Sequence, residues 1–265
     1  MAQPTSSQQP AAPLAGRVAL VTGGGRGLGK AIAQRLAADG ALVAIGYGGN
    51  AATAAETVRQ IGELGGAAFA VHGDISRLSG IESMFSALDD ELRARLGENK
   101  FDLLVNNAGV NAAASFHEVD EATFDRLFGT NVKGTFFVTQ MAISRLRDHG
   151  RIINVTTGLT RFVFPGYAAY AATKGSIHVL TQFLAAELGD RGITVNDIAP
   201  GATDTDINAD WLRDNADAQR QLAAGTALKR VGQPSDIAGV AAFLASRDAG
   251  WVTAQHIEAS GGAQL

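Results

Sequence analysis

Tyr170 and Lys174 are four residues apart in an alanine-rich stretch and together could carry out proton transfer. At this spacing on a helix two residues share one face, with Cβ atoms roughly 5–6 Å apart. An ammonium so close favours the phenolate, so we expect the pKa of Tyr170 to fall from its usual value of about 10 toward neutrality. Such a tyrosine can exchange a proton with a substrate oxygen. Tyr167 also lies on this side of the helix, but it is about two turns, or about 10 Å, from Lys174.

A strand, a glycine loop and a helix follow one another near the N-terminus, an order that favours dinucleotide binding. Residues 17–22 form a short apolar run, and apolar residues at 28, 32, 33 and 36 have helical spacing. Between them the glycines are spaced Gly-x-x-x-Gly-x-Gly, which differs from the Gly-x-Gly-x-x-Gly fingerprint. Glycines let a pyrophosphate approach the backbone, and helix N-terminal amides attract its charge. We predict cofactor contacts from Gly23, Gly25, Arg26, Gly27, Leu28 and Gly29.

The turn after the second predicted strand, 41–45, bears on which nicotinamide cofactor binds. Folds that hold NAD place an acidic residue there for the ribose hydroxyls, whereas this turn reads Gly-Tyr-Gly-Gly-Asn over residues 46–50. A ribose 2′-phosphate would meet no repulsion from it, and Arg26 could pair with the phosphate. We therefore predict NADPH (NADP+) as cofactor in preference to NADH, with Tyr47 and Asn50 at its binding site.

The remaining pattern alternates between strands and helices. Further strands are predicted at 67–71, 101–105, 151–157, 193–199 and 256–259, and helices at 51–64, 77–96, 121–128, 132–146, 170–188 and 234–245. This alternation predicts an α/β fold, a single doubly wound Rossmann-type domain with a seven-stranded parallel sheet flanked by helices. We assign the domain to residues 15–265 and interpret residues 1–14 as a disordered tail, because they lack an apolar pattern.

Composition excludes several classes of function. The net charge of −4 and the pI near 5.7 argue against a nucleic-acid partner. The chain has no cysteine, and its five histidines show no paired spacing, so no metal site is expected. No apolar run approaches the about 20 residues of a membrane span. We expect a cytoplasmic enzyme that acts on a small-molecule carbonyl or alcohol.

Taken together, these segments resemble the short-chain dehydrogenase/reductase family over roughly residues 15–262. The matching motifs are the glycine loop, Asp74, Asn-Asn-Ala-Gly at 106–109, Asn131, Tyr170-x-x-x-Lys174, and Pro200-Gly201 with Thr205. The resemblance implies that Tyr170 donates the proton, that Lys174 holds the nicotinamide ribose and lowers the tyrosine pKa, and that Asn131 anchors a water of the proton relay. Asp74 and Asn131 could instead only cap a turn or a helix. The resemblance also implies cofactor contacts from Asp74, Ile75, Asn106, Ala108, Gly109, Pro200, Gly201, Thr203 and Thr205.

Two positions depart from the family pattern: Ser260, where relatives usually carry an aspartate before two glycines, and Thr157. Relatives carry a serine thirteen residues before the tyrosine, where this chain has Thr157. Threonine keeps the hydroxyl that would bond the substrate oxygen, while its methyl restricts χ1. Thr156 is one residue away, and strand alternation lets only one of the two face the substrate. We choose Thr157 from the spacing.

Within the family, the chain is similar to NADPH-using ketone reductases such as the polyhydroxynaphthalene reductases. This resemblance implies reduction of a ketone, reversible as an alcohol dehydrogenase, by a homotetramer. An NAD-linked alcohol dehydrogenase and a nucleotide-sensing protein without catalysis remain alternatives. Four aromatic residues fall on segments that should border the substrate pocket: Phe162, Phe164, Tyr167 and Trp211.

Overall fold

The structure, a computed structural model, describes residues 12–206, 208 and 212–265. In these ranges seven strands form one sheet in the order β3-β2-β1-β4-β5-β6-β7, and every pairing is parallel. The strands are β1 (Val18–Thr22), β2 (Leu42–Tyr47), β3 (Ala67–His72), β4 (Phe101–Asn106), β5 (Leu146–Val155), β6 (Thr194–Pro200) and β7 (His256–Ala259). The predicted seven-stranded parallel sheet is confirmed.

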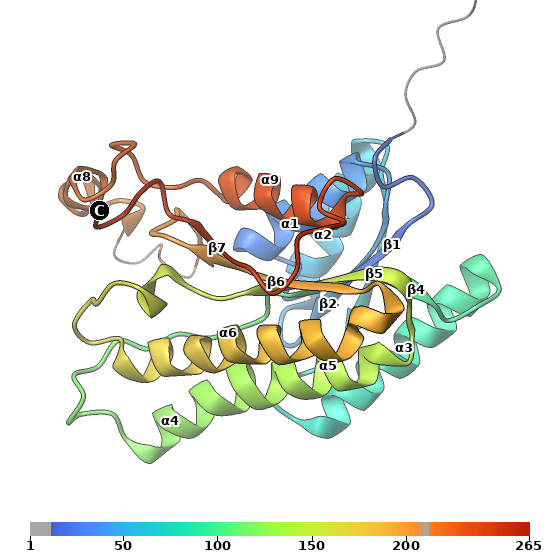
Figure 1. The fold of residues 1–265 in the computed structure, drawn as a ribbon, viewed down its shortest axis with the longest axis horizontal. Coiled ribbons are helices and arrows are strands. Elements are labelled where there is room, and N and C mark those ends of the chain that lie inside the picture. Colours follow the sequence, from blue (N-terminus) through green and yellow to red (C-terminus); the bar gives the residue numbers. More distant parts are fainter. Residues whose placement is uncertain (1–11, 207, 209–211) are drawn as a thin grey trace, which may run out of the picture.

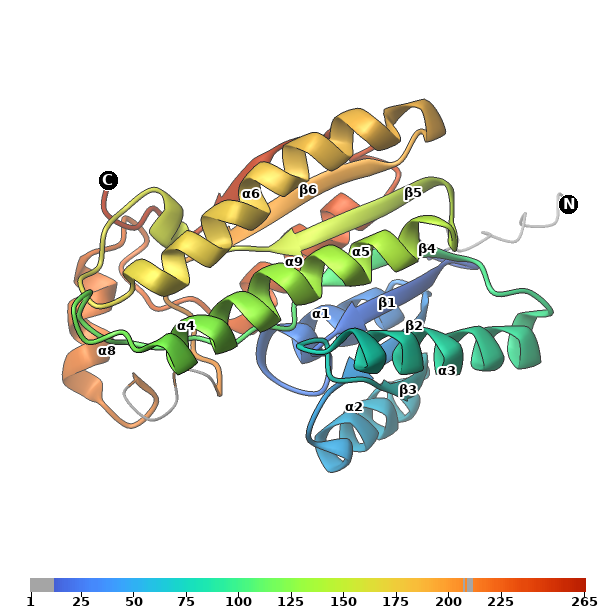
Figure 2. The ribbon, with the colours of Figure 1, turned by 90° about the horizontal axis from the view of Figure 1, so that it is seen from below.

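Helices cover both faces of this sheet (Figure 1). One layer contains α1 (Gly27–Ala38), α2 (Ala51–Glu63) and α9 (Pro234–Ala245). The other contains α3 (Leu78–Leu96), α4 (Glu121–Phe128), α5 (Thr135–Ile143) and α6 (Ala168–Leu188), with α4 and α5 running as one long rod beside α6 (Figure 2). The helix α8 (Ala216–Ala224) lies beyond the end of the sheet, near the C-terminus. Short helical turns are η1 (Gly129–Gly134), η2 (Gly158–Thr160) and η3 (Gly189–Arg191).

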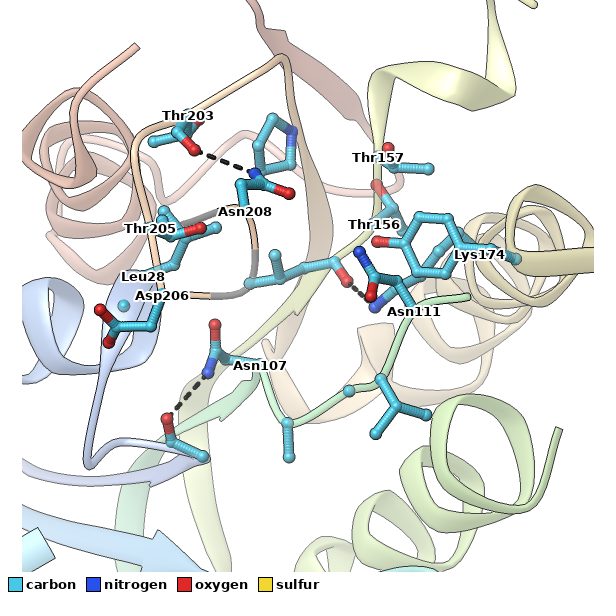
Figure 3. Close-up of a pocket in the computed structure, with 18 of the residues that line it drawn as sticks. Leu28, Asn107, Asn111, Thr156, Thr157, Lys174, Thr203, Thr205, Asp206 and Asn208 are labelled. Carbon is cyan, nitrogen blue, oxygen red and sulfur yellow. Dashed lines mark hydrogen bonds between the residues drawn. The ribbon is translucent and has the colours of Figure 1, made fainter. Parts of the chain in front are cut away.

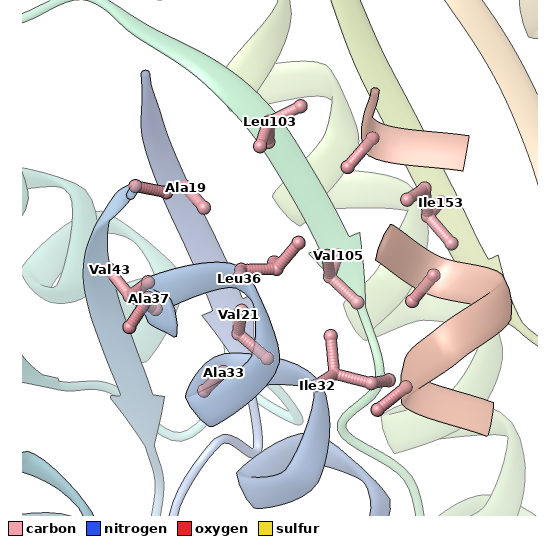
Figure 4. Close-up of a cluster of buried hydrophobic side chains, with 14 of the residues drawn as sticks. Ala19, Val21, Ile32, Ala33, Leu36, Ala37, Val43, Leu103, Val105 and Ile153 are labelled. Carbon is pink, nitrogen blue, oxygen red and sulfur yellow. The ribbon is translucent and has the colours of Figure 1, made fainter. Parts of the chain in front are cut away.

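Two hydrophobic cores lie on either side of the sheet, because a parallel sheet covered on both faces buries both sides of its strands. On the α1 side, Ile32 and Leu36 pack onto Val21, Val105 and Ile153 from three neighbouring strands (Figure 4). All five residues of β1 are buried. This rigid centre fixes where the loops at the carboxyl ends of the strands must lie.

Several predicted boundaries change, including the start of the strand predicted at 151–157. Leu14 was assigned to the tail, yet it is 2% exposed and its amide donates to Asp39 O. The rest of that predicted tail, residues 1–11, lies outside the described residues. The helix predicted to reach 146 ends at Ile143, and β5 begins at Leu146. Within β5, the backbone of His149 adopts a left-handed conformation with φ +62°. None of the helices that the structure describes is long and apolar enough to cross a bilayer.

Candidate active site

A cleft of about 840 Å³ opens at the carboxyl ends of the strands. Segments that follow β1, β4, β5 and β6 line it (Figure 3). The chain leaves β1 toward β2 and later returns to β4 on the other side of β1. Ligands of doubly wound sheets bind at such a reversal of strand order. The fold therefore places the cleft where a dinucleotide is expected.

Most of the predicted site residues line this cleft. They are Gly23, Gly25, Arg26, Gly27, Leu28, Tyr47, Asn50, Asp74, Ile75, Ala108, Gly109, Thr157, Tyr170, Lys174, Pro200, Gly201, Thr203 and Thr205. Three predicted residues, Gly29, Asn106 and Asn131, lie behind its wall. Their side-chain or backbone contacts show what each of them does instead.

The glycine loop forms a tight backbone cradle. Gly23 has φ +64°, and a Cβ there would come 2.9 Å from Ala108 Cα. A Cβ at Gly29 would come 2.2 Å from Gly23 O, so Gly29 lets α1 approach the loop without itself touching the cleft. The first amides of α1 have no partner within the helix, and they open onto the cleft beside Gly27. This cradle fits a pyrophosphate.

Asn107, which sequence reasoning did not single out, ties the loop to β4. Its Nδ2 donates to Thr22 O at 3.0 Å and to Gly23 O at 3.2 Å. The amide of Asn107 donates in turn to Thr22 Oγ1. The signal available in the sequence was a second asparagine directly after a strand that neighbours the glycine loop. Asn107 therefore holds the start of the glycine loop against the segment that follows β4.

The turn after β2 and the segment after β3 form the far end of the cleft. Arg26 is exposed there and, among the described residues, forms no ion pair or hydrogen bond through its side chain. Asn50 caps α2, with Oδ1 accepting from Thr53 N at 3.1 Å. Asp74 Oδ1 accepts from Ser76 N at 3.0 Å, and this backbone hydrogen bond lowers the pKa of Asp74.

Lys174 lies inside the wall of the cleft and is 5% exposed. Its Nζ donates to Val155 O at 2.7 Å, at the end of β5. Burial lowers the pKa of Lys174 to about 8, and the negative charge of Asp197 acts in the opposite direction. An ammonium has three donors, so two N–H groups remain for a ligand in the cleft.

The expected direction of the Tyr170 pKa shift is wrong. Burial raises the pKa of Tyr170 to about 12, while a hydrogen bond with the Thr157 side chain opposes this rise and the nearby Tyr167 adds to it. Loss of water around the hydroxyl disfavours the phenolate, and the spacing of Tyr170 and Lys174 carries no information about that loss. Lys174 instead directs its Nζ at the Val155 carbonyl. At neutral pH Tyr170 therefore holds its proton.

The two candidate threonines face different surroundings. Thr156 Oγ1 lies inside the sheet, where it donates to Asp197 Oδ1 at 2.6 Å and is 3.0 Å from Ile198 O. Thr157 lines the cleft together with Tyr170, and its Oγ1 accepts weakly from Leu159 N at 3.4 Å. Both threonines border the cleft, but only the Thr156 hydroxyl is engaged by partners inside the sheet.

Asn131 lies in a π-helical turn, η1, between α4 and α5. It is fully buried: Oδ1 accepts from Val110 N at 2.9 Å, and Nδ2 donates to Val110 O at 2.8 Å and to Thr173 Oγ1 at 3.1 Å. Its side chain caps neither a helix nor a turn of its own segment. It joins the loop after β4 to α6, one residue before Lys174. Such π turns often occur at functional sites.

Contrary to the prediction, Asn106 does not line the cleft. Its Nδ2 donates to Thr139 Oγ1 and to Asn154 Oδ1, both at 2.9 Å, and Asn154 continues to Thr181. Alternation along β4 turns this side chain toward α5 and α6 and away from the nucleotide cradle. Asn106 therefore fastens two helices to the centre of the sheet.

The substrate end of the cleft has an aromatic border. Phe162, Phe164 and Tyr167 line it, as predicted, and Trp211 lies outside the described residues. The rings of Phe164 and Tyr167 meet edge-to-face at 5.9 Å, and those of Tyr167 and Tyr170 at 6.4 Å. Leu222 of α8 also lines the cleft and was not anticipated, because nothing in the sequence brings that helix to the site.

A parallel sheet has a glycine cradle at its reversal point, next to a half-buried tyrosine and a buried lysine and threonine. These features define a nucleotide-dependent oxidoreductase of the Rossmann type. A family model described as enoyl-(acyl carrier protein) reductase matches residues 23–264. Its relatives include proteins named short chain dehydrogenase/reductase. The chain belongs to the short-chain dehydrogenase/reductase family of oxidoreductases.

Among the relatives, an uncharacterized oxidoreductase of Methylorubrum extorquens is 41% identical over 94% of this chain and 98% of its own length. A hydroxynaphthalene reductase of Aspergillus fumigatus is 37% identical over 92% of this chain and 90% of its own. Among solved structures, a landomycin C-6 ketoreductase with bound NADP and rabelomycin is 41% identical, with a TM-score of 0.88 over 96% of this chain and 98% of its own. A promiscuous reductase that catalyses keto-reduction at C1 during lugdunomycin biosynthesis is 42% identical, with a TM-score of 0.92 over 96% and 100%.

Proposed function

We propose that this protein is an NADPH-dependent ketone reductase in which Tyr170 gives its proton to the carbonyl oxygen. The observation that carries the proposal is the meeting of three residues at the cleft: Tyr170 and Thr157 with their hydroxyls, and Lys174 with its ammonium. They lie beside a backbone cradle that fits a dinucleotide. The solved ketoreductase with bound NADP supports this reading. Bound NADPH would supply the hydride.

Tyr170 is suited to act as a general acid. With a pKa of about 12 it is protonated at neutral pH, and the alkoxide that develops on a reduced ketone is a stronger base than a phenolate. Thr157 can give a second hydrogen bond to the same oxygen. Donors aimed at a developing oxyanion contribute about 2.7–4 kcal/mol each to catalysis. The same groups return the proton in reverse, so we propose that the enzyme also oxidises the alcohol.

Lys174 and Asn131 organise the cofactor side of this proton path. Lys174 Nζ gives one of its three N–H groups to Val155 O, and the other two would hold the ribose hydroxyls of a bound cofactor. Asn131 fixes Val110 and, through Thr173, the turn of α6 that precedes Lys174. The distance between the loop after β4 and the ammonium is therefore set by one side chain.

A preference for NADPH over NADH is supported by the far end of the cleft. Arg26 is free to pair with a 2′-phosphate, the turn at 46–50 carries no acid, and the N-terminus of α2 faces the same space. Helix N-termini favour phosphate groups. Asp74 lies beyond them and would meet the adenine, with its carboxylate held by Ser76 N.

We propose that the substrate is a ketone on a flat, fused-ring aromatic compound. The ring edges of Phe164, Tyr167 and Tyr170 form a row at the cleft, and Phe162 and Leu222 add apolar surface. Aromatic side chains bind flat rings by stacked or edge-to-face contact. The relatives named as hydroxynaphthalene and angucycline reductases support the same class of compound.

The test is oxidation of NADPH or NADH by the purified protein with a panel of fused-ring aromatic ketones, aliphatic ketones, β-keto esters, quinones and steroids. We expect turnover with NADPH and the highest kcat/KM among the aromatic ketones. Turnover with NADH alone would favour an NAD-linked dehydrogenase. Tight NADPH binding without turnover of any ketone would contradict the proposal and favour a nucleotide-sensing protein.

We further propose a homotetramer built on the outer faces of α4, α5 and α6. Large apolar side chains are exposed there: Phe124 by 46%, Phe136 by 44%, Val179 by 50% and Phe183 by 63%. Exposed apolar patches of this kind mark interaction surfaces. Light scattering of the parent and of Phe183→Glu would test this assembly, since an unchanged tetramer in the variant would exclude α6 as its interface. The cytoplasmic location stays a prediction.

A further inference from the structure

Outside the cleft, near Lys174, a buried carboxylate contacts two histidines that are far apart in the sequence. Asp197 on β6 is fully buried. His178 Nδ1 of α6 lies 2.9 Å from Asp197 Oδ2, and His256 Nδ1 of β7 lies 2.5 Å from Asp197 Oδ1. The two imidazole rings meet edge-to-face at 4.5 Å. No residue of this cluster lines the cleft, so none has a part in the proposed reaction so far.

The cluster is connected to Lys174 through one peptide unit of the chain. The Val155 carbonyl accepts from Lys174 Nζ, and the next residue, Thr156, donates its hydroxyl to Asp197 Oδ1 at 2.6 Å. His178 follows Lys174 by one helical turn on the same face of α6. The ammonium and the carboxylate thus contact two consecutive residues at the end of β5, Val155 and Thr156.

These distances describe a hydrogen-bonded cluster and not a metal centre. Ligand atoms of a tetrahedral zinc ion lie about 3.3 Å apart when each is about 2.0 Å from the metal. Each carboxylate oxygen of Asp197 instead lies within hydrogen-bonding distance of a different imidazole. His256 Nε2 is also within 3.2 Å of Thr160 Oγ1.

Among the described residues, three titratable groups contact Asp197 or are acted on by its charge. Lys174 and His178 come from α6, and His256 comes from β7. Asp197 forms no ion pair with an arginine or a lysine there. A buried ion acts strongly on nearby groups, because little water screens it. Asp197 raises the pKa of Lys174 against the larger effect of burial.

We propose that Asp197 is a positioning residue that keeps Lys174 protonated and holds the end of β5, with His178, His256 and Thr156 as its donors. Its consequence for catalysis rests on the proposed function, since a charged Lys174 is needed there to hold the ribose and support Tyr170. The effect on Lys174 itself requires no activity. The inference therefore has one test that does not depend on turnover and one that does.

The first test is a ¹³C NMR titration of the lysine side chains in the cofactor-free protein, with the Lys174 signal assigned by its loss in Lys174→Met. In Asp197→Asn we expect the midpoint of Lys174 to fall by about one pH unit, a typical size for the effect of one nearby charge. Asp197→Ala is the second variant, to be used if Asp197→Asn does not fold, because alanine removes the charge and needs no hydrogen-bond partners. We expect the same fall in the Lys174 midpoint.

The matched control is Asp102→Asn. Asp102 is also a buried strand carboxylate, bonded to Arg17 and Arg147, but it lies at the start of β4 and not at the cleft. This variant should lose thermal stability and leave the Lys174 midpoint unchanged. An equal shift in both variants would mean that general loosening, and not the charge of Asp197, moves Lys174, and would overturn the proposal.

The second test is the pH profile of kcat/KM for ketone reduction. In Asp197→Asn we expect the basic limb to move to lower pH by the same amount as the NMR midpoint. Unchanged Lys174 titration in both neutral variants would overturn the proposal. The proposal would also be overturned if the purified parent held one equivalent of bound zinc and Asp197→Asn held none, because the cluster would then be a metal site. A parent without any ketone reduction would contradict the proposed function alone, and the NMR result would still decide the role of Asp197.

Discussion

Replacing Thr157 and Thr156 separately by valine should distinguish the two hydroxyls, because the first change should lower kcat and the second should lower Tm. Valine keeps the shape of threonine and removes its hydrogen bonds. In Thr157→Val the substrate oxygen loses one of two donors, which costs about 2.7–4 kcal/mol, or on the order of 10²–10³ in kcat.

Thr156→Val should behave differently, because its hydroxyl serves the buried carboxylate of Asp197. Leaving a buried polar group without a donor costs about 1–3 kcal/mol. In a chain of this size each kcal/mol lowers Tm by roughly 2–4 °C, so we expect a loss of several degrees. We expect kcat to stay within about tenfold of the parent, since the Tyr170–Thr157 pair is intact.

The assay is kcat and KM with one aromatic ketone, the Kd of NADPH by fluorescence titration, and Tm by circular dichroism, for both variants and for Thr157→Ser. The serine variant keeps the hydroxyl and should remain active. NADPH affinity should not change in Thr157→Val. A crippled Thr156→Val beside an active Thr157→Val would show that the strand presents the other hydroxyl. If neither matters, Tyr170 works without a hydroxyl partner on β5.

Three further outcomes follow from the site. Tyr170→Phe should lose about 10²–10⁴-fold or more in kcat with NADPH affinity retained, and near-parental turnover would exclude Tyr170 as the proton donor. Arg26→Ala should erase most of the preference for NADPH over NADH, since a charge-assisted contact contributes about 1.5–3 kcal/mol; an unchanged ratio of kcat/KM values would place the 2′-phosphate elsewhere. Gly29→Ala should destabilise by about 1–3 kcal/mol, because its Cβ would lie 2.2 Å from Gly23 O. Gly62→Ala is its control, since a Cβ there meets nothing within 4 Å, and equal Tm values would show that the loop can yield.

The sequence alone determined the sheet, the glycine cradle and the Tyr170–Lys174 pair. Each of these depends on local rules: buried runs make parallel strands, glycines allow a tight turn, and a spacing of four places two residues on one helical face. The predicted starts and ends of α3 and α9 lie within one residue of those observed for the same reason. Local pattern was therefore enough to place most of the cleft.

Only the tertiary structure decided how the side chains behave. It turned the Asn106 side chain toward Asn154 on the neighbouring strand, and it engaged the Thr156 hydroxyl with Asp197 while Thr157 lines the cleft with Tyr170. These choices depend on which strand or helix packs against a residue, and sequence spacing does not contain that information. The pKa of Tyr170 rose instead of falling, because desolvation is set by everything that surrounds the hydroxyl. His178 and His256 meet at Asp197 because β6 pairs with β7 beneath α6, a contact between segments that no local pattern connects.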